Sequence, residues 1–259
     1  MKLSILTENI AQSQFEAEHG LSYYIEYDDK KILFDTGQSD MFLRNAKKLN
    51  INLQNTDFVV LSHGHFDHGN GLKHLINNKL LCHNNAFIKR YRKHDNSYLG
   101  LDLSFEELSQ KFEIIKTQKP YKITEKIIFL GQIPRITSFE SKTTDFIDAN
   151  GNNDFVLDDS AIVAIKNDEL IIITACSHSG ICNIIEYAKK ITEINKIQTV
   201  IGGFHLKHNN LQTKQTINYF KEQNISQILP SHCTQFPALV AFYNEFKIKQ
   251  VKTGMIFNF

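Results

Sequence analysis

Residues 61–69 read LSHGHFDHG and bring three histidines and one aspartate within a few positions of one another. On an extended turn, His63 and His65 can face one metal ion, while Asp67 and His68 can face a second. Imidazole nitrogen and carboxylate oxygen are ligands that suit zinc, iron or manganese. The glycines between and after them allow the backbone to fold tightly. The stretch therefore predicts a site for one or two divalent ions, zinc first among them.

An apolar strand over residues 58–61 leads directly into this loop, and later apolar strands also end near histidines. Loops at strand ends are where a rigid scaffold displays ligands. Six of the eleven histidines lie within two residues of Gly, Ser or Asp in such loop contexts: His63, His65, His68, His178, His205 and His232.

The order of predicted elements repeats in the second half of the chain. Apolar, β-branched runs predict strands at 3–6, 21–27, 31–34, 58–61, 126–130, 161–165, 170–174, 198–201, 225–229 and 255–259. Helical spacing predicts helices at 40–49, 70–76, 181–192, 213–224 and 238–246, and a capping box at Ser104 and Glu107 predicts one through residue 112. This pattern favours an α/β fold, a four-layer αββα sandwich. One domain over residues 1–259 is expected, with the less regular stretch 84–153 as an insertion over the active site.

Composition excludes several classes of function. With 29 Lys+Arg against 28 Asp+Glu the net charge is +1, which gives no general attraction to nucleic acid or to an anionic membrane. No apolar run is long enough for a membrane span, and the N-terminus does not resemble a signal peptide. Four widely spaced cysteines favour reduced thiols and a cytoplasmic location.

The metal motif resembles that of the metallo-β-lactamase superfamily. Asp35, in the segment Ile32-Leu33-Phe34-Asp35-Thr36-Gly37, resembles the superfamily's strand-end aspartate. That aspartate orients a metal-ligating imidazole by contacting the ring nitrogen that does not bind the metal. The resemblance implies the metallo-β-lactamase fold and a metal-dependent hydrolase.

Within the superfamily, the chain more closely resembles the subfamily that contains dihydropterin–ribofuranosylaminobenzene-phosphate synthase and many metal-dependent hydrolases. The resembling segments are His19-Gly20-Leu21-Ser22, Leu33-Phe34-Asp35-Thr36-Gly37, Gly131-Gln132-Ile133-Pro134-Arg135, Cys176-Ser177-His178-Ser179-Gly180, Gly202-Gly203-Phe204-His205-Leu206 and Pro230-Ser231-His232-Cys233-Thr234.

One departure concerns the late ligands. The usual Pro-Gly-His-Thr motif and the bridging aspartate are absent. The resemblance implies His178 and His232 as ligands in their place, with His205 as an alternative ligand or a substrate-facing acid. Cys176 takes roughly the bridging position, as a metal thiolate, a supporting group or a small packed residue. His19 is expected to line the pocket or to bind metal.

Basic residues supply candidates for substrate binding. The run Lys89–His94 is most simply a solvated surface, but its Arg90 and Arg92 could clamp a phosphate or carboxylate. Arg135 is a further candidate for the same role. The expected partner is therefore a small molecule, which would carry a phosphate group if these arginines bind one. The sequence makes no prediction about the oligomeric state.

Three functions compete. In the first, a metal-activated water cleaves an ester, lactone or phosphate ester, with Asp67 as ligand and catalytic proton acceptor. In the second, implied by the resemblance, a transferase condenses a pterin methyl diphosphate with an aryl amine. In the third, the protein binds iron for redox chemistry or sensing.

Overall fold

The computed structural model describes residues 1–76 and 78–259, which form two compact units. Unit 1 comprises residues 1–118, 145–154 and 252–259, and unit 2 comprises residues 119–144 and 155–251. The single domain with an insertion at 84–153 stays a prediction.

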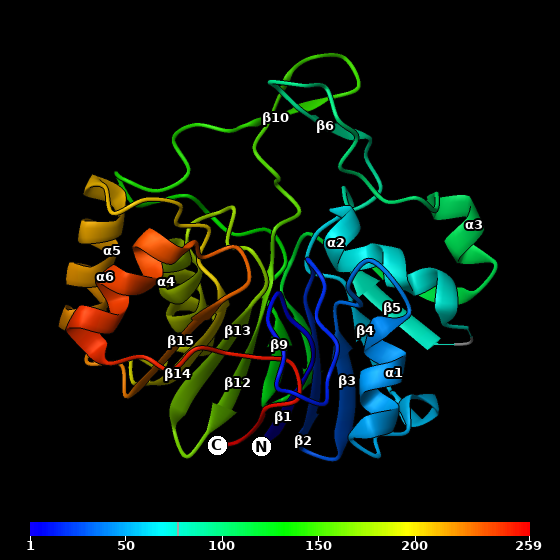
Figure 1. The fold of residues 1–259 in the computed structure, drawn as a ribbon, viewed down its shortest axis with the longest axis horizontal. Coiled ribbons are helices and arrows are strands. Elements are labelled where there is room, and N and C mark those ends of the chain that lie inside the picture. Colours follow the sequence, from blue (N-terminus) through cyan, green and yellow to red (C-terminus); the bar gives the residue numbers. More distant parts are fainter. Residues whose placement is uncertain (77) are drawn as a thin grey trace. The chain divides into compact units, whose positions relative to one another are not determined.

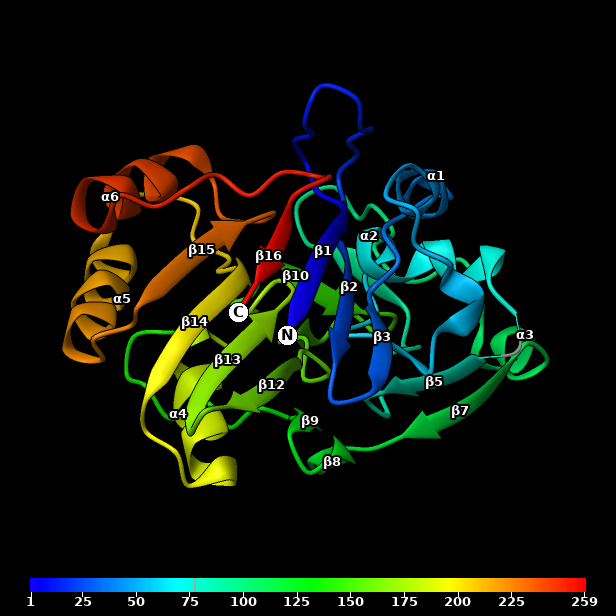
Figure 2. The same cartoon turned by 90° about the horizontal axis from the view of Figure 1, so that it is seen from below.

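Unit 1 contains a seven-stranded sheet in the order β16-β1-β2-β3-β4-β5-β7. Figure 2 shows its first four strands side by side. They pair antiparallel, whereas β3, β4, β5 and β7 run parallel. The carboxyl ends of the parallel strands therefore meet at one edge, where open α/β sheets bind ligands. The strands are β1 (Lys2–Thr7), β2 (Ser22–Tyr27), β3 (Lys30–Phe34), β4 (Phe58–Val60), β5 (Asn78–Cys82), β7 (Phe112–Lys116) and β16 (Ile256–Asn258).

Helices cover one face of this sheet. Phe42 and Ala46 of α1 (Met41–Lys48) are buried with Leu33 and Val59 of the strands. The other helices of unit 1 are η1 (Leu53–Asn55), α2 (Phe66–Gly69), η2 (Asn70–His74) and α3 (Phe105–Ser109), the last of which begins with the predicted capping box. The helix expected over residues 70–76 is a short 3₁₀ helix, η2.

A small sheet forms within the stretch that the sequence left irregular. It has the order β11-β10-β6, with β6 (Arg90–Arg92), β10 (Phe146–Asp148) and β11 (Asn153–Asp154) all in unit 1. Arg90 Nε lies 3.0 Å from Asp154 Oδ2, and both side chains are buried. This ion pair joins the first strand of the small sheet to its last.

Unit 2 contains a six-stranded sheet in the order β15-β14-β13-β12-β9-β8. Three neighbouring strands, β13, β14 and β15, run parallel, and the remaining pairs are antiparallel. Its strands are β8 (Tyr121–Thr124), β9 (Ile127–Phe129), β12 (Ala161–Lys166), β13 (Glu169–Thr174), β14 (Ile197–Gly203) and β15 (Gln227–Ser231).

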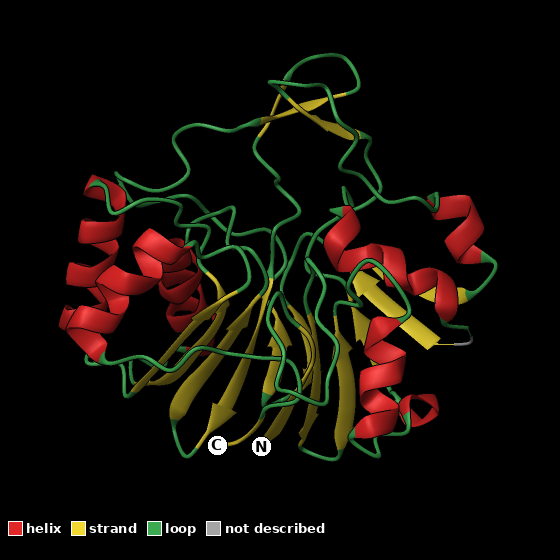
Figure 3. Ribbon diagram, in the orientation of Figure 1, coloured by secondary structure: helices red, strands yellow, loops and turns green. Residues whose placement is uncertain are grey.

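Three helices lie on one face of the sheet in unit 2 (Figures 1 and 3). They are α4 (Ile181–Thr192), α5 (Leu211–Glu222) and α6 (Phe236–Phe246). Their apolar sides bury Ile184, Phe220 and Phe242 against Val163 and Ile172 of the strands. Among the described residues, no helix combines the length and apolar character that crossing a bilayer requires.

Candidate metal centre

The donors of unit 1 lie in the loop that follows β4 and in the first turn of α2. His63 and His68 are fully buried, and His65 and Asp67 are each 6% exposed. Because β3 and β4 are parallel neighbours, this loop begins beside the end of β3, where Asp35 lies. The sheet topology therefore brings Asp35 to the histidines across a sequence separation of about thirty residues.

Asp35 is the central acceptor of a buried hydrogen-bond network. Its Oδ1 accepts from the backbone N–H of Ser62 at 2.8 Å, and its Oδ2 contacts Ser62 Oγ at 2.7 Å. The same Oδ2 lies 2.7 Å from His68 Nδ1. Asp35 adopts a positive φ of 57°, a conformation that costs energy in a residue other than glycine.

This network sets the tautomers of two imidazoles. A carboxylate only accepts, so its contact with His68 places that ring's hydrogen on Nδ1 and the lone pair on Nε2. Ser62 Oγ donates its one hydrogen to Asp35 and can then only accept from His63 Nδ1, 2.9 Å away. His63 therefore also carries its lone pair on Nε2, as a metal ligand requires.

The donor atoms converge. His63 Nε2 lies 3.0 Å from His65 Nδ1, and His68 Nε2 lies 3.6 Å from Asp67 Oδ2. His19 Nε2 approaches the same Asp67 oxygen at 3.1 Å, so the predicted pocket residue also joins the cluster.

Burial, reinforced by the neighbouring His68 and His65, holds the pKa of His63 well below its ordinary value. A neutral imidazole keeps the lone pair that a metal needs, so this set of imidazoles and one carboxylate suits a divalent ion.

Close backbone packing fixes the loop. A Cβ at Gly64 would lie 1.7 Å from the carbonyl oxygen of Ala86, so only glycine fits there. Further along, Thr36 N donates to the His68 carbonyl at 2.8 Å. The rings are also packed from the small sheet, since Phe146 meets His65 edge-on at 5.0 Å between centroids. The loop is thus held in position by the protein itself.

The candidate metal ligands of unit 2 lie on three loops, which follow the adjacent parallel strands β13, β14 and β15. A residue with positive φ marks each loop: Ser177 at 58°, His205 at 49° and His232 at 48°. The rings of His178 and His205 contact each other, with centroids 4.3 Å apart. His232 is 7% exposed. The structure therefore gathers the predicted late candidates of unit 2 at one edge of its sheet.

Cys176 lies in this group together with a residue that the sequence analysis missed. Cys176 Sγ, a ring nitrogen of His205 and Cys233 Sγ lie within 4.8 Å of one another. Cys233 Sγ also contacts the Cys176 carbonyl oxygen at 3.3 Å. Burial raises the pKa of Cys233, but hydrogen bonds with Cys176 and His205 outweigh burial and bring the pKa well below its usual value.

Two buried carboxylates support these loops: Asp159, which the sequence favours as a capping or solvated residue that could also approach the site, and Glu140, which the sequence analysis missed. Asp159 Oδ2 accepts from Ser179 N at 2.9 Å and from Ser179 Oγ, beside His178. Glu140 accepts from the backbone N–H groups of Cys182 and Asn183, each at 3.0 Å. Burial raises the pKa of both carboxyls. An acidic residue in a loop gives no sequence signal that it will be buried.

The three arginines proposed for substrate binding have different surroundings. The expectation of a solvated surface is wrong for Arg90, which is fully buried and paired with Asp154. Arg135 donates to the carbonyl oxygens of Phe155 and Val156, so part of its hydrogen-bonding capacity serves the backbone. Arg92 is 42% exposed beside Asp95, and of the three it best suits a role toward solvent.

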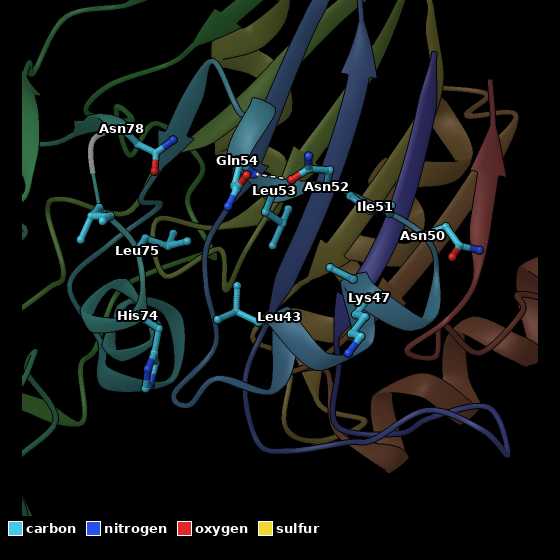
Figure 4. A pocket seen from close by; sticks show the side chains of 12 residues that line it. Leu43, Lys47, Asn50, Ile51, Asn52, Leu53, Gln54, His74, Leu75 and Asn78 are labelled. Atoms are coloured by element: carbon cyan, nitrogen blue, oxygen red, sulfur yellow. Dashed lines mark hydrogen bonds between the residues drawn. The ribbon is translucent and has the colours of Figure 1, made fainter.

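A hollow of about 650 Å³ in unit 1 has none of these donors among its described lining residues (Figure 4). Leu43, Leu53 and Leu75 line it together with amide side chains, one of which, Asn52, accepts from Gln54 N at 3.0 Å. Among its described lining residues, His74 is the only one of a metal-ligating type. The hollow therefore does not compete with the histidine cluster as a metal site.

Known proteins resemble this chain along its length. The sequence pattern of the metallo-β-lactamase superfamily matches residues 16–79, which include Asp35 and the histidine loop. An uncharacterized protein of Methanocaldococcus jannaschii is 40% identical over 245 residues, 92% of each chain. The 7,8-dihydropterin-6-methyl-4-(β-D-ribofuranosyl)-aminobenzene-5'-phosphate synthase of the same organism is 34% identical, covering 100% of this chain and 97% of the synthase.

A solved structure agrees with the fold as well. It is described as a metal-dependent hydrolase of the β-lactamase superfamily, and it matches with a TM-score of 0.90 at 30% identity. The match covers 100% of this chain and 99% of that one. The predicted α/β fold of the metallo-β-lactamase type is thus confirmed, and the chain belongs to the metallo-β-lactamase superfamily.

Proposed function

We propose that the protein is a metal-dependent hydrolase that cleaves an ester, lactone or phosphate ester of a small molecule. The observation that carries the proposal is the buried cluster of His63, His65, Asp67 and His68, in which Asp35 sets the tautomers of two rings. When bound, one or two divalent ions, zinc foremost, would supply the Lewis acidity that lets water attack near neutral pH.

Asp67 is the proposed proton acceptor. Its Oδ2 lies between His68 Nε2 at 3.6 Å and His19 Nε2 at 3.1 Å. The carboxylate can therefore orient the attacking water and take its proton, while His19, whose side chain is 58% exposed, can pass that proton to solvent. His178 and His232 are proposed to complete the ligand set.

Two side chains support a small substrate. Phe146 offers an apolar face beside His65, and the exposed guanidinium of Arg92 suits a phosphate or carboxylate group. A cytoplasmic location belongs to the same proposal, because the four cysteines, all within the described residues, form no disulfide.

The test combines metal analysis with substrate panels. We expect metal-loaded wild type to turn over members of an ester, lactone or phosphodiester panel. Asp67→Asn should lose at least a hundredfold in rate, since general acid–base groups contribute about 10²–10⁴-fold. His94→Ala, which removes an exposed histidine, should keep both rate and metal content. Elemental analysis of His63→Ala, His178→Ala and His232→Ala then tests each proposed ligand in turn.

A transferase is the second candidate, because the synthase is similar over the whole of this chain. There the ions would favour departure of diphosphate, and the chain would hold a pterin methyl diphosphate against an aryl amine. Incubation of metal-loaded protein with those two compounds separates the functions. Turnover there, with none in the hydrolytic panels, would overturn the hydrolase proposal.

A further inference from the structure

The small sheet of unit 1 turns one face toward the histidine loop. Its strands β6 and β10 lie side by side in Figure 1, paired in antiparallel register. The ring of Phe146 on β10 meets the ring of His65 edge-on, with 5.0 Å between centroids. The face of the small sheet that carries Phe146 is therefore the face next to the candidate metal ligands of unit 1.

The strand register decides which other side chains share that face. Phe146 is paired with Arg92 of β6 on one side and with Asp154 of β11 on the other. Side chains of directly paired residues point to the same face, with Cβ atoms about 4.5–5.5 Å apart. Alternation along β6 adds Arg90, which precedes Arg92 by two residues. Two arginines and one aspartate thus flank the aromatic ring.

Arg90 reaches across the middle strand of the small sheet. Its backbone belongs to β6, whereas Asp154 belongs to β11, and β10 lies between them. Arg90 Nε nevertheless lies 3.0 Å from Asp154 Oδ2, and the two side chains are 0% and 5% exposed. The guanidinium therefore passes over β10 beside Phe146. Breaking such a pair would leave a buried charge uncompensated, so the pair holds the three strands in one register.

Further contacts fix β6 relative to the histidine loop. Phe66 N donates to the Leu99 carbonyl oxygen at 3.0 Å, and Leu99 N donates to the Arg90 carbonyl oxygen at 2.9 Å. Arg90 Nη2 also donates to the Asn85 carbonyl oxygen at 3.4 Å. Arg90 is thus joined through its backbone to the start of α2 and through its side chain to β11.

Arg92 differs from Arg90 in being open to solvent. Its side chain is 42% exposed, and its Nη1 lies 3.6 Å from Asp95 Oδ2. The other oxygen of Asp95 accepts from Ser97 N at 3.0 Å and from Ser97 Oγ at 2.8 Å, which holds the carboxylate in place. A guanidinium has five N–H donors in a planar fork, so one carboxylate contact leaves donors for a second anion.

We propose that the small sheet selects substrates that carry an anionic group, a carboxylate or a phosphate, beside an apolar part. The inference rests on the proposed function, because it places the substrate at the histidine loop. Arg92 binds the anionic group, and the ring of Phe146 packs against the apolar part. Arg90 and Asp154 are positioning residues, since their buried pair holds both of these side chains on the face next to His65.

Binding of two small anions and one neutral analogue tests the selection without any turnover. Isothermal titration calorimetry of the zinc-loaded protein compares benzoate and phenylphosphonate with benzamide. Arg92→Gln should weaken anion binding by about ten- to a hundredfold, the cost of losing a charge-assisted hydrogen bond, and should leave benzamide binding unchanged. An effect on benzoate alone identifies a carboxylate as the preferred group, and an effect on phenylphosphonate alone identifies a phosphate.

Lys89→Gln is the matched control, because it removes an exposed cation from the same basic run and should leave anion binding unchanged. Absence of anion binding by wild type would overturn the proposal. Equal anion affinity in wild type and Arg92→Gln would overturn it as well.

A double-mutant cycle tests the positioning role of the buried pair. Asp154→Asn removes the charge that Arg90 contacts, so the strand that carries Arg92 should lose its fixed position. Arg92→Gln should then cost much less anion affinity in the Asp154→Asn background than in wild type. The same loss in both backgrounds would show that the pair does not position Arg92. Arg92→Gln alters an exposed side chain, so the selection is tested even if Asp154→Asn does not fold.

A hydrolase assay separates this inference from the proposal on which it rests. Turnover by wild type, with anion affinity unchanged in Arg92→Gln, would contradict the inference alone. Anion affinity that depends on Arg92, without turnover in any hydrolytic panel, would contradict the hydrolase alone.

Discussion

Asp35 shows how one side chain can prepare a metal site before any ion arrives. It accepts three hydrogen bonds from Ser62 and His68 and thereby sets the tautomers of His63 and His68. It does so from a φ of 57°, which asparagine and aspartate tolerate better than other residues. Both the charge of this carboxylate and its backbone conformation serve the cluster.

Replacing Asp35 with asparagine should separate the effect of the carboxylate's charge on metal affinity from the effect of the side chain's shape. Asparagine tolerates the positive φ, but its amide nitrogen donates, so His68 Nδ1 would be driven to accept and its hydrogen would move to Nε2. We expect metal affinity to fall about 10–100-fold while the fold is retained. Competition against a chromophoric chelator measures the affinity, and urea unfolding checks the fold.

Two further variants are compared with Asp35→Asn, one as a control and one that removes the acceptor completely. Asp57→Asn alters another aspartate of unit 1, which accepts from Lys31 N, and should leave metal affinity unchanged. Asp35→Ala should in addition cost about 3 kcal/mol or more of stability, because buried donors lose their acceptor. Unchanged metal affinity in Asp35→Asn would mean that the carboxylate does not control the tautomer.

The sequence was informative about residues whose chemistry is visible in a motif. His63, His65, Asp67 and His68 stand together in the chain, and Asp35 ends a strand, so their proximity could be predicted. Cys233, Glu140 and Asp159 could not be predicted in the same way. Each acquires its role through a partner from another segment, such as Ser179 for Asp159. Arg90 was misread because nothing in its basic run indicates burial beside Asp154.

Elements were predictable where an apolar pattern is long enough. The helix at 181–192 and the strand at 170–174 lie within a residue of their observed bounds, since burial imposes their periodicity. The strands β6, β10 and β11 have three residues or fewer and no clear alternation. Pairing between distant segments creates them, and that pairing leaves no local signal.

The helix α4 depends on a carboxylate from outside the helix. Its N-cap, Gly180, has no side chain to cap the first turn, and a Cβ there would lie 2.5 Å from Glu140. Glu140 takes over by accepting from Cys182 N and Asn183 N. Because Gly180 follows His178 by two residues, this cap also anchors the loop of a predicted ligand.

The pH dependence of stability should reveal the Glu140 cap. Burial raises the pKa of Glu140, so its stabilising contribution is complete below the unfolded pKa and is lost as pH rises through the folded pKa. Wild type should therefore lose stability relative to Glu140→Gln as pH rises above the ordinary carboxyl pKa of about 4.3, with a slope of at most about 1.4 kcal/mol per pH unit. Urea unfolding at stepped pH gives both curves.

Glu186 on the same helix provides a control of opposite sign. Burial raises the pKa of Glu186, but hydrogen bonds with Tyr219 and Lys189 outweigh burial and lower the pKa overall. The stability that Glu186 contributes is present above the unfolded pKa and is lost as pH falls through the folded pKa. The stability of wild type relative to Glu186→Gln should therefore increase as pH rises. Parallel trends in the two variants would show that the Glu140 carboxyl is not destabilised by its burial.

At the scale of the whole molecule, the two units repeat one arrangement. Each has a sheet with helices on one face, and each places parallel strands so that their carboxyl ends carry the candidate donors. The repeated order of strands and helices in the sequence predicted this, because strand ends and loops follow from element order. The order in which the strands pair within each sheet could not be predicted from the sequence, since it depends on contacts between distant strands.

Metal removal should destabilise the protein as a whole. Any ligand that binds only the folded state adds RT ln(1 + [L]/Kd), about 2.7 kcal/mol when free metal is a hundred times Kd. We expect wild type saturated with zinc to unfold at higher temperature than the same protein after EDTA, with restoration on adding zinc back. A His63→Ala/His65→Ala variant should lose most of that increment, whereas His94→Ala, altered at an exposed ring, should keep it. Identical unfolding curves for chelated and zinc-saturated wild type would mean that the cluster, despite its geometry, holds no ion in the folded state.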